Sequence, residues 1–149
     1  MASVVANSYK HHMFKGSFNL QTVSDVKMML LETIATGPDN PDLDFVDDIA
    51  ADEFSDTGYT GGFGGAGRKA LATRAATVNN TDDRSEFDFD NIVWSGLGGT
   101  NSVVMCEIVR EITNDAASDL ISAHDVTNTG TDGTDYTLTI GTTGAIHIT

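Results

Sequence analysis

The chain has 149 residues, a size typical of one domain, and 40% of them are hydrophobic, which is too many for a disordered chain. Its net charge of −14 comes from 22 acidic and 8 basic residues, and 17 of the acidic residues are aspartate. A surface this acidic argues against binding to nucleic acid or to anionic lipid, because both need basic residues on the protein. We therefore expect one domain over residues 1–149, with no nucleic-acid or membrane partner.

Nothing in the sequence is typical of an export signal or a membrane span. Met1–Ala6 is apolar over only a few residues and has no basic region before it. The apolar run Val26–Leu31 contains a lysine and is far shorter than a spanning helix. We expect synthesis in the cytoplasm. The single cysteine, Cys106, lies in a strongly apolar segment, which predicts an inert core residue rather than a reactive thiol.

The first predicted element is a short helix near the N-terminus that stops at Gly16. His11 and His12 lie within it, and adjacent side chains on a helix point in different directions, so we expect no shared metal ion there. The apolar residues that recur at every fourth position are Val5, Tyr9 and Met13.

Two more elements are predicted before residue 52. Val26–Leu31 has the pattern of a strand that is buried on both faces, and a short helix fits the same pattern. Residues 37–41 hold both prolines of the chain and indicate a rigid loop. Residues 44–51 are then predicted to form one helical turn, capped by Asp42 or Asp44.

Gly58–Gly67 contains six of the fifteen glycines, interrupted by Tyr59 and Phe63. The segment lacks the Gly-Lys-Ser/Thr ending of a phosphate-binding loop, and it does not lead from a strand into a long amphipathic helix. Nucleotide binding is therefore not expected. We predict a mobile loop, or an arm that becomes ordered against a neighbouring subunit.

The clearest strand pattern flanks a polar, turn-forming segment at Asn79–Asp83. Leu71–Val78, before this turn, is rich in small and β-branched residues. After the turn, Phe87 and Phe89 alternate strictly with acidic residues. Period two with one polar face predicts a strand, and together the two segments predict a β-hairpin.

The alternation changes parity at Asp90-Asn91. A bulge or turn at this point would return Ile92 and Trp94 to the same core as the two phenylalanines, and Asp-Asn is suitable turn chemistry. Trp94 is the only tryptophan, and we expect it to anchor that core.

The remaining segments complete an all-β pattern. Short strands separated by turns roughly every 8–12 residues predict a single β-sandwich, of jelly-roll or immunoglobulin-like type, with a short N-terminal helix. The further predicted elements are a strand from Glu53-Phe54, strands at Val103–Ile112, Leu120–Val126, Tyr136–Ile140 and Ile146–Ile148, a polar loop at Thr127–Gly133 and a tight turn at Gly141–Gly144.

No catalytic constellation stands out in the sequence. Asp88 and Asp90 share a strand face, but it is the polar face of a sheet, where carboxylates are ordinary. His124 and His147 have no nucleophile elbow near them, and no Cys-His spacing suits zinc. We expect no catalytic residue, no resident metal and no cofactor. Calcium is the alternative left open, because Asp39–Asp44 and Thr131–Asp135 offer oxygen ligands without the spacing of an EF-hand.

A series of motifs follows in a definite order over about residues 8–126. The motifs are Phe14-Lys15-Gly16, Phe18-Asn19-Leu20, Val26–Leu31, Asp44–Ile49, Glu53–Gly62, Thr77–Arg84 and Phe87–Trp94. In this order they resemble a group of small virion proteins of tailed bacteriophages. Relative to that group, this chain has extra glycines at Phe63–Gly67.

The resemblance implies a non-enzymatic structural protein of the virion. The role we expect is that of a capsid decoration (cement) protein on the capsid surface, which binds the major capsid protein as a homo-oligomer and stabilises the assembled head. The alternative is a tail, neck or fibre component with a glycan- or receptor-binding β-sandwich, and a small hydrolase is the third hypothesis. Contacts are expected from Ala2–Tyr9 and Gly58–Gly67, with individual partner-binding residues unassigned.

Overall fold

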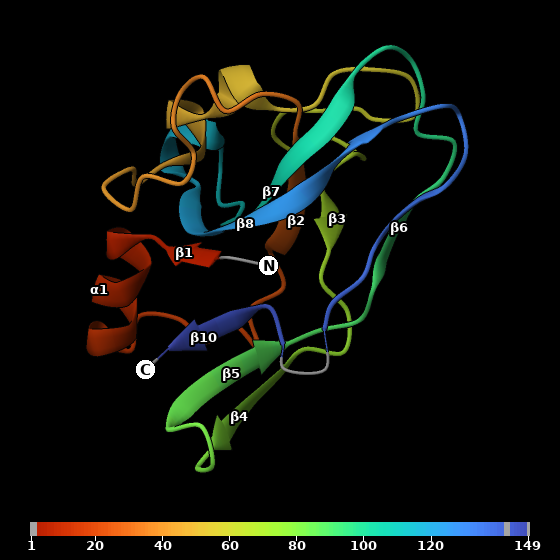
Figure 1. Cartoon of the computed structure of the whole chain (residues 1–149). Helices are drawn as coiled ribbons and strands as arrows, with labels where there is room; N and C mark the ends of the chain where they lie inside the picture. The colour runs from red at the N-terminus through yellow and green to blue at the C-terminus, as the bar shows by residue number, and fades with distance from the viewer. Residues whose placement is uncertain (1–2, 142–143, 149) are drawn as a thin grey trace.

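The computed structural model describes residues 3–141 and 144–148, and its fold is an all-β sandwich with one short α-helix (Figure 1). This confirms the predicted fold class. The elements are β1 (Ser3–Val5), α1 (Asn7–Lys15), β2 (Val26–Leu31), β3 (Lys69–Ala70), β4 (Ala75–Asn79), β5 (Arg84–Asp88), β6 (Ile92–Trp94), β7 (Ser102–Arg110), β8 (Asp119–Gly130), β9 (Tyr136–Leu138) and β10 (Ile146–Ile148), with 3₁₀ turns η1 (Val46–Asp48), η2 (Ala50–Asp52) and η3 (Asp115–Ala117).

The strands form three antiparallel sheets. The five-stranded sheet has the order β1-β8-β7-β2-β3, the three-stranded sheet the order β10-β5-β4, and β6 pairs with β9. In Figure 1 the three-stranded sheet lies below the five-stranded one, and β6 descends on the right. Buried side chains from all three sheets form one hydrophobic cluster. Trp94 is fully buried in it and donates its indole N–H to the carbonyl oxygen of Gly67 at 2.6 Å, which confirms its predicted place in the core.

The central strands confirm the prediction of doubly buried segments. β2 lies between β7 and β3, and all of its residues except Lys27 are buried. A strand in the middle of a covered sheet needs apolar side chains on both faces, which explains its continuous apolar run. Cys106, on β7, is fully buried, as predicted, and burial raises the pKa of its thiol.

The predicted hairpin is present as β4 and β5, and Phe87 and Phe89 are both buried. Its first arm is shorter than predicted, because the chain leaves strand geometry between β3 and β4, where Thr73 has a φ of 50°. The break at Asp90-Asn91 is confirmed. There the chain passes from one sheet to another, and Ile92 joins the same buried cluster.

The N-terminal segment from which partner contacts are expected lies against the five-stranded sheet. Within the described residues 3–9, β1 pairs with β8, and Tyr9 on α1 is buried. Ala2 lies outside the described residues. The predicted helix is present but begins at Asn7, and it ends at Gly16, whose left-handed φ of 62° confirms the predicted stop. Val5 belongs to the strand instead, because the free edge of β8 supplies its backbone partners.

Other elements also differ from prediction, and β7 and β9 end at Arg110 and Leu138, two residues earlier than predicted. β8 continues to Gly130 through residues predicted to be a loop, because β7 extends far enough to pair with them. The predicted helical turn is two short 3₁₀ turns. Its capping carboxylate is Asp48, which accepts from the N–H of Phe45, rather than Asp42 or Asp44. The strand predicted from Glu53 is a single bridge to Leu31, and the predicted turn at 141–144 includes residues outside those described.

Candidate functional site

The densest group of charged side chains lies around Arg68, whose side chain is fully buried. Its guanidinium donates five hydrogen bonds, so every N–H has an acceptor. Glu53 accepts two of them, at 2.9 and 2.6 Å, and Asp115 accepts two more, at 2.6 and 3.1 Å. Glu111 accepts the fifth at 3.2 Å. Two carboxylates thus each receive a bidentate pair, which is the strongest geometry for this donor.

Distant parts of the chain contribute to this Arg68 cluster, which we define as Arg68, Glu53, Glu111, Asp115 and Lys27. Glu53 follows η2, Glu111 follows β7, and Asp115 begins η3. Lys27 on β2 forms an ion pair with Glu111. Three acidic and two basic groups therefore neutralise one another almost completely. Burial by itself lowers the pKa of Arg68, but hydrogen bonds to Glu53 and Asp115 and their charges raise it above its ordinary value.

The glycine-rich loop closes over this cluster, so the predicted mobility is wrong. The N–H of Gly62 donates to Glu53 at 2.9 Å, and the N–H of Gly64 donates to Glu111 at 3.2 Å. The hydroxyl of Tyr59 also donates to Glu53, at 3.0 Å, and the side chain of Tyr59 is only 7% exposed. Backbone N–H groups and a phenol thus donate to the same carboxylate oxygens that accept from Arg68, so each of these oxygens accepts two hydrogen bonds.

The conformation of this loop requires glycine at a specific place. A Cβ atom at Gly67 would lie 2.6 Å from the ring of Tyr59, closer than real side chains come. The ring therefore packs directly on the glycine backbone. Sequence reasoning missed this arrangement because the partners of Arg68 are 15, 43 and 47 residues away, and no local spacing connects them.

Other buried ionisable groups lie inside the five-stranded sheet. The hydroxyl of Ser122 and Nε2 of His124 are 2.7 Å apart, and both side chains are closed to solvent. Burial lowers the pKa of His124 to about 4, so the ring is neutral near pH 7. Glu107 is fully buried, and burial raises its pKa well above the ordinary value. A serine–histidine pair that no substrate can reach is a structural contact.

The two loops for which calcium was left open as an alternative use their oxygens for hydrogen bonds within the protein. Asn40 accepts from the N–H of Asp42, and Asp42 accepts from the side chain of Asn7. Asp132 accepts from both the N–H and the hydroxyl of Thr134. Across residues 3–141 and 144–148, no group of three or more His, Cys, Asp or Glu side chains could hold a metal ion. His12 contacts Asp119 rather than sharing a ligand with His11.

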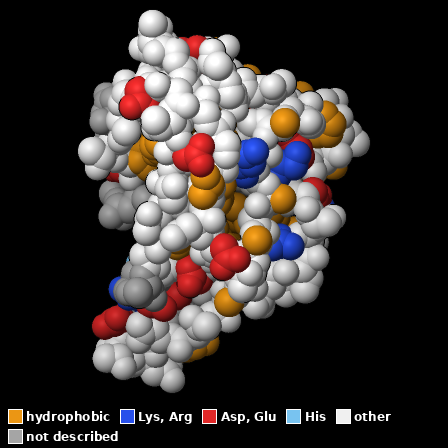
Figure 2. Space-filling model, turned by 90° about the vertical axis from the view of Figure 1, so that its right-hand side faces the viewer, with side chains coloured by type: hydrophobic (Ala, Val, Ile, Leu, Met, Phe, Trp, Pro, Cys, Tyr) orange, Lys and Arg blue, Asp and Glu red, His pale blue; other side chains and the backbone are white. Residues whose placement is uncertain are grey.

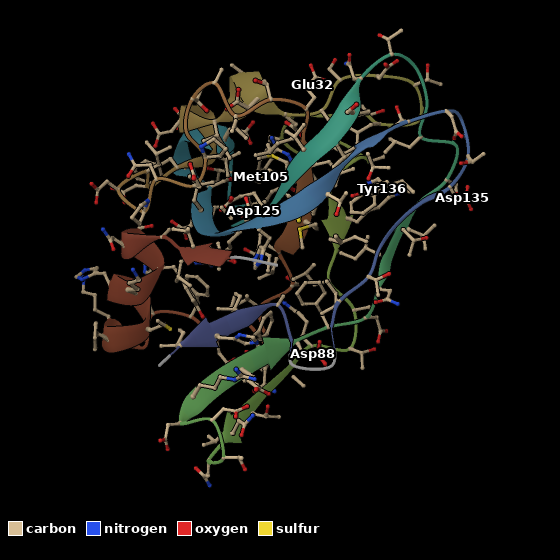
Figure 3. The ribbon with its side chains drawn as sticks, viewed as in Figure 1. Glu32, Asp88, Met105, Asp125, Asp135 and Tyr136 are labelled. Carbon is tan, nitrogen blue, oxygen red and sulfur yellow. The ribbon has the colours of Figure 1, made fainter. Side chains whose placement is uncertain are left out.

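A polar cleft of about 700 Å³ lies between the outer half of β8 and the segment from β9 to β10. We call it the threonine cleft. Asp125 projects from β8 and Tyr136 stands at the start of β9, so the two come from different walls (Figure 3). Burial raises the pKa of Tyr136 to about 12. The main polar lining residues are Thr127, Thr129, Thr137 and Thr139.

A second hollow, of about 340 Å³, lies between α1 and the three-stranded sheet. We call it the apolar groove. Phe14, also on α1 but not among the lining residues, is 92% exposed. Acidic side chains gather in the lower half of the face shown in Figure 2, at the height that β4, β5 and β10 occupy in Figure 1. The main apolar lining residues are Tyr9, Met13, Phe18, Phe87, Ile146 and Ile148.

Comparisons with protein-family models, curated proteins and solved structures found no match to this chain. Within the described ranges, none of the helices has the length and apolar character needed to cross a bilayer. The interpretation of the site therefore rests on its own geometry. That geometry offers a closed charged cluster and two open hollows, one polar and one apolar.

Removing the guanidinium of Arg68 should destabilise the folded protein. We expect Arg68→Ala to lower the free energy of unfolding by about 3–5 kcal/mol, because three carboxylates would lose their buried partner. The free energy of unfolding of Arg68→Lys should lie between those of the natural chain and Arg68→Ala, because lysine keeps the charge but cannot form bidentate hydrogen bonds with the carboxylates. Arg84→Ala is the control, because this partly exposed arginine pairs with Asp82 and Glu86 and should cost about 0–1 kcal/mol. Equal losses for Arg68→Ala and Arg84→Ala in urea denaturation would contradict this role.

The buried carboxyl of Glu107 should produce a distinct pH dependence. Its pKa is raised in the folded state, so the unfolded state releases the proton first, from about pH 4.5 upward. Its contribution to stability is therefore complete below that pH and is lost as the pH rises toward the folded pKa. The stability of Glu107→Gln relative to the natural chain should increase by about 1.4 kcal/mol per pH unit in this window. His124 is present in both chains and cancels, and a difference that does not vary with pH would contradict the prediction.

Proposed function

We propose that this chain is a non-enzymatic structural protein of a tailed bacteriophage virion, and that it is a capsid decoration (cement) protein. In this role it is made in the host cytoplasm, binds the major capsid protein in the assembled head as a homo-oligomer, and remains on the capsid surface. The observation that carries the proposal is the apolar groove on a chain of net charge −14. An open apolar hollow on such a surface suits a protein partner.

The lining of the groove supports docking rather than catalysis. Aromatic and aliphatic side chains from α1 and from β5 and β10 line it, and the carboxylate in its lining is that of Glu86. Glu86 is hydrogen bonded to Asn79 and Arg84, which lower its pKa, so it is an ordinary surface carboxylate. An apolar side chain of a coat subunit would be desolvated in this groove, and burial of that kind dominates many protein contacts.

The closed interior supports a mechanical role. The Arg68 cluster joins the glycine-rich loop, the end of β7 and η3 into one body, with the guanidinium at its centre closed to solvent. A rigid body that binds only the assembled shell stabilises that shell by mass action. The excess of acidic groups on the outside would keep particles apart in solution.

Binding to assembled shells tests this proposal directly. The purified protein should co-sediment with empty capsids, and particles that lack it should release their DNA at a lower temperature. Met13→Glu, at the groove, should weaken capsid binding by roughly tenfold or more, since a buried methionine contributes about 1.5–3 kcal/mol. Glu keeps helix propensity high. Val93→Glu, at a site on β6 that is 46% exposed, adds the same charge and should bind normally.

Two outcomes would contradict the proposal. One is the absence of binding to assembled shells by the natural chain. The other is a location restricted to a few copies at the tail of an imaged particle. Thermal melting of both variants would first establish that each of them folds.

The threonine cleft favours a second candidate, a glycan- or receptor-binding component of a tail, neck or fibre. Hydroxyl groups line it, Asp125 offers a carboxylate, and Tyr136 offers an aromatic edge. Sugars are bound by polar hydrogen-bonding groups combined with an aromatic surface. The other aromatic candidates fit less well, because Tyr59 is buried in the Arg68 cluster and Phe63 stands apart in the glycine-rich loop.

Glycan binding by the isolated protein would separate the two candidates. The decoration proposal predicts no binding of the natural chain to an array of host-surface glycans. The fibre alternative predicts binding that Tyr136→Ala abolishes and that Met13→Glu leaves unchanged. Both variants are informative, because the two residues line different hollows.

A further inference from the structure

The outer edge of β4 is an open strand edge within the described ranges. β4 has five residues and pairs only with β5, whereas the strands at the other sheet edges have two or three residues. Its side chains are small and uncharged, in the order Ala-Ala-Thr-Val-Asn. Proteins protect an open edge with charged residues, proline or a bulge, because unpaired backbone groups attract another strand. β4 has none of these devices, and its central residues 76–78 are exposed.

We propose that β4 is a self-association surface, at which β4 of a second copy of this chain pairs with it antiparallel about a twofold axis. The two three-stranded sheets would then form one sheet of six strands. When the twofold axis passes beside Thr77, this residue faces Thr77 of the partner subunit. Ala76 then faces Val78 of the partner subunit. The central residues 76–78 are therefore complementary to themselves, with apolar residues opposite one another and threonine opposite threonine, while Ala75 faces Asn79 of the partner subunit.

The side-chain pattern across the sheet favours this register. Thr77, Glu86 and His147 form one cross-strand row, and Val78, Ser85 and Ile148 form the next. Successive residues of a strand point to opposite faces, so Val78 lies on the uncharged face together with Ile148. Val78 is 74% exposed in the single chain. Pairing would place Val78 against Ala76 of the partner subunit. The largest apolar side chain on this edge would then be removed from water.

Electrostatic repulsion between copies is weak at this edge, although each carries a charge of −14. The nearest acidic residue on the face of Thr77 is Glu86, which forms an ion pair with Arg84 at 2.7 Å. Across the paired edge the two copies of Glu86 would be three strand spacings apart, or about 14 Å. That exceeds the screening length of about 8 Å at physiological ionic strength. Repulsion comes from the acidic residues that flank β4, which are Asp82 and Asp83 in the hairpin turn and Asp88 opposite Ala75, and from the rest of the surface, and it is weakened by salt.

Disulfide trapping on the purified chain tests the pairing and its register. Thr77→Cys should form a covalent dimer under mild oxidation, because opposed residues in antiparallel strands are about 4.5–5.5 Å apart, within reach of a disulfide. The natural Cys106 is fully buried and adds no background. The control is Val93→Cys, on β6. Cross-linking of Thr77→Cys should be roughly tenfold faster than in this control, and faster still in high salt.

A mixing experiment distinguishes the proposed register from random collision. A mixture of Ala76→Cys and Val78→Cys should cross-link faster than either variant alone, because these two positions face each other across the axis. Val78→Glu should reduce the dimer observed by sedimentation of the natural chain at high salt by roughly tenfold or more, since it places a charge on the edge. Val93→Glu should not reduce it.

Three results would overturn the inference. They are equal cross-linking rates for Thr77→Cys and Val93→Cys at every salt concentration, faster cross-linking of Ala76→Cys alone than of the mixture, and unchanged sedimentation of Val78→Glu. The pairing adds a surface to the role proposed above and needs no virion for its test. Failure here would therefore leave capsid docking standing, and failure of capsid docking would leave the pairing standing.

Discussion

The buried guanidinium of Arg68 is the constraint that holds together the glycine-rich loop, the end of β7 and η3. A charge removed from water must find counter-charges and hydrogen-bond acceptors inside the protein, or the folded state is disfavoured. Here the five N–H groups meet three carboxylates that belong to different segments, so those segments are fixed relative to one another. The carboxylates in turn bind backbone N–H groups of Gly62 and Gly64. A loop rich in glycine is thereby held against the body of the protein, with Tyr59 packed in the core.

This arrangement separates the charges of the interior from those of the surface. The acidic and basic groups of the Arg68 cluster nearly cancel, so most of the net charge of −14 lies on the outside. Against that acidic surface the uncharged regions stand out. They are the apolar groove beside α1 and the open edge of β4, and both belong to the three-stranded sheet. Our proposals place a coat subunit in the groove and a second copy on the edge, so that one sheet makes both contacts.

Patterns within single segments could be predicted from the sequence. The alternation around Phe87 and Phe89, the apolar runs of β2 and β7, and the stop at Gly16 each follow from local rules, and the structure confirms them. The errors occurred where a distant partner decides the outcome. Ser3–Val5 is a strand because β8 has a free edge, and Thr127–Gly130 extends β8 because β7 reaches it. Glycine content suggested mobility at 58–67, but the buried carboxylates that fix the loop are far away in sequence. The groove, likewise, combines residues from α1 and from both ends of the chain, and no motif connects them.

Hydrogen exchange at single amides measures the central claim most directly. If the buried cluster fixes the glycine-rich loop, the amides of Gly62 and Gly64 should be protected to nearly the same extent as those of β7, because their release requires the cluster to open. The amide of Phe63, between them, serves as an internal reference in the same loop. Exchange of Gly62 and Gly64 at the rate of an unstructured peptide, while β7 stays protected, would contradict the account.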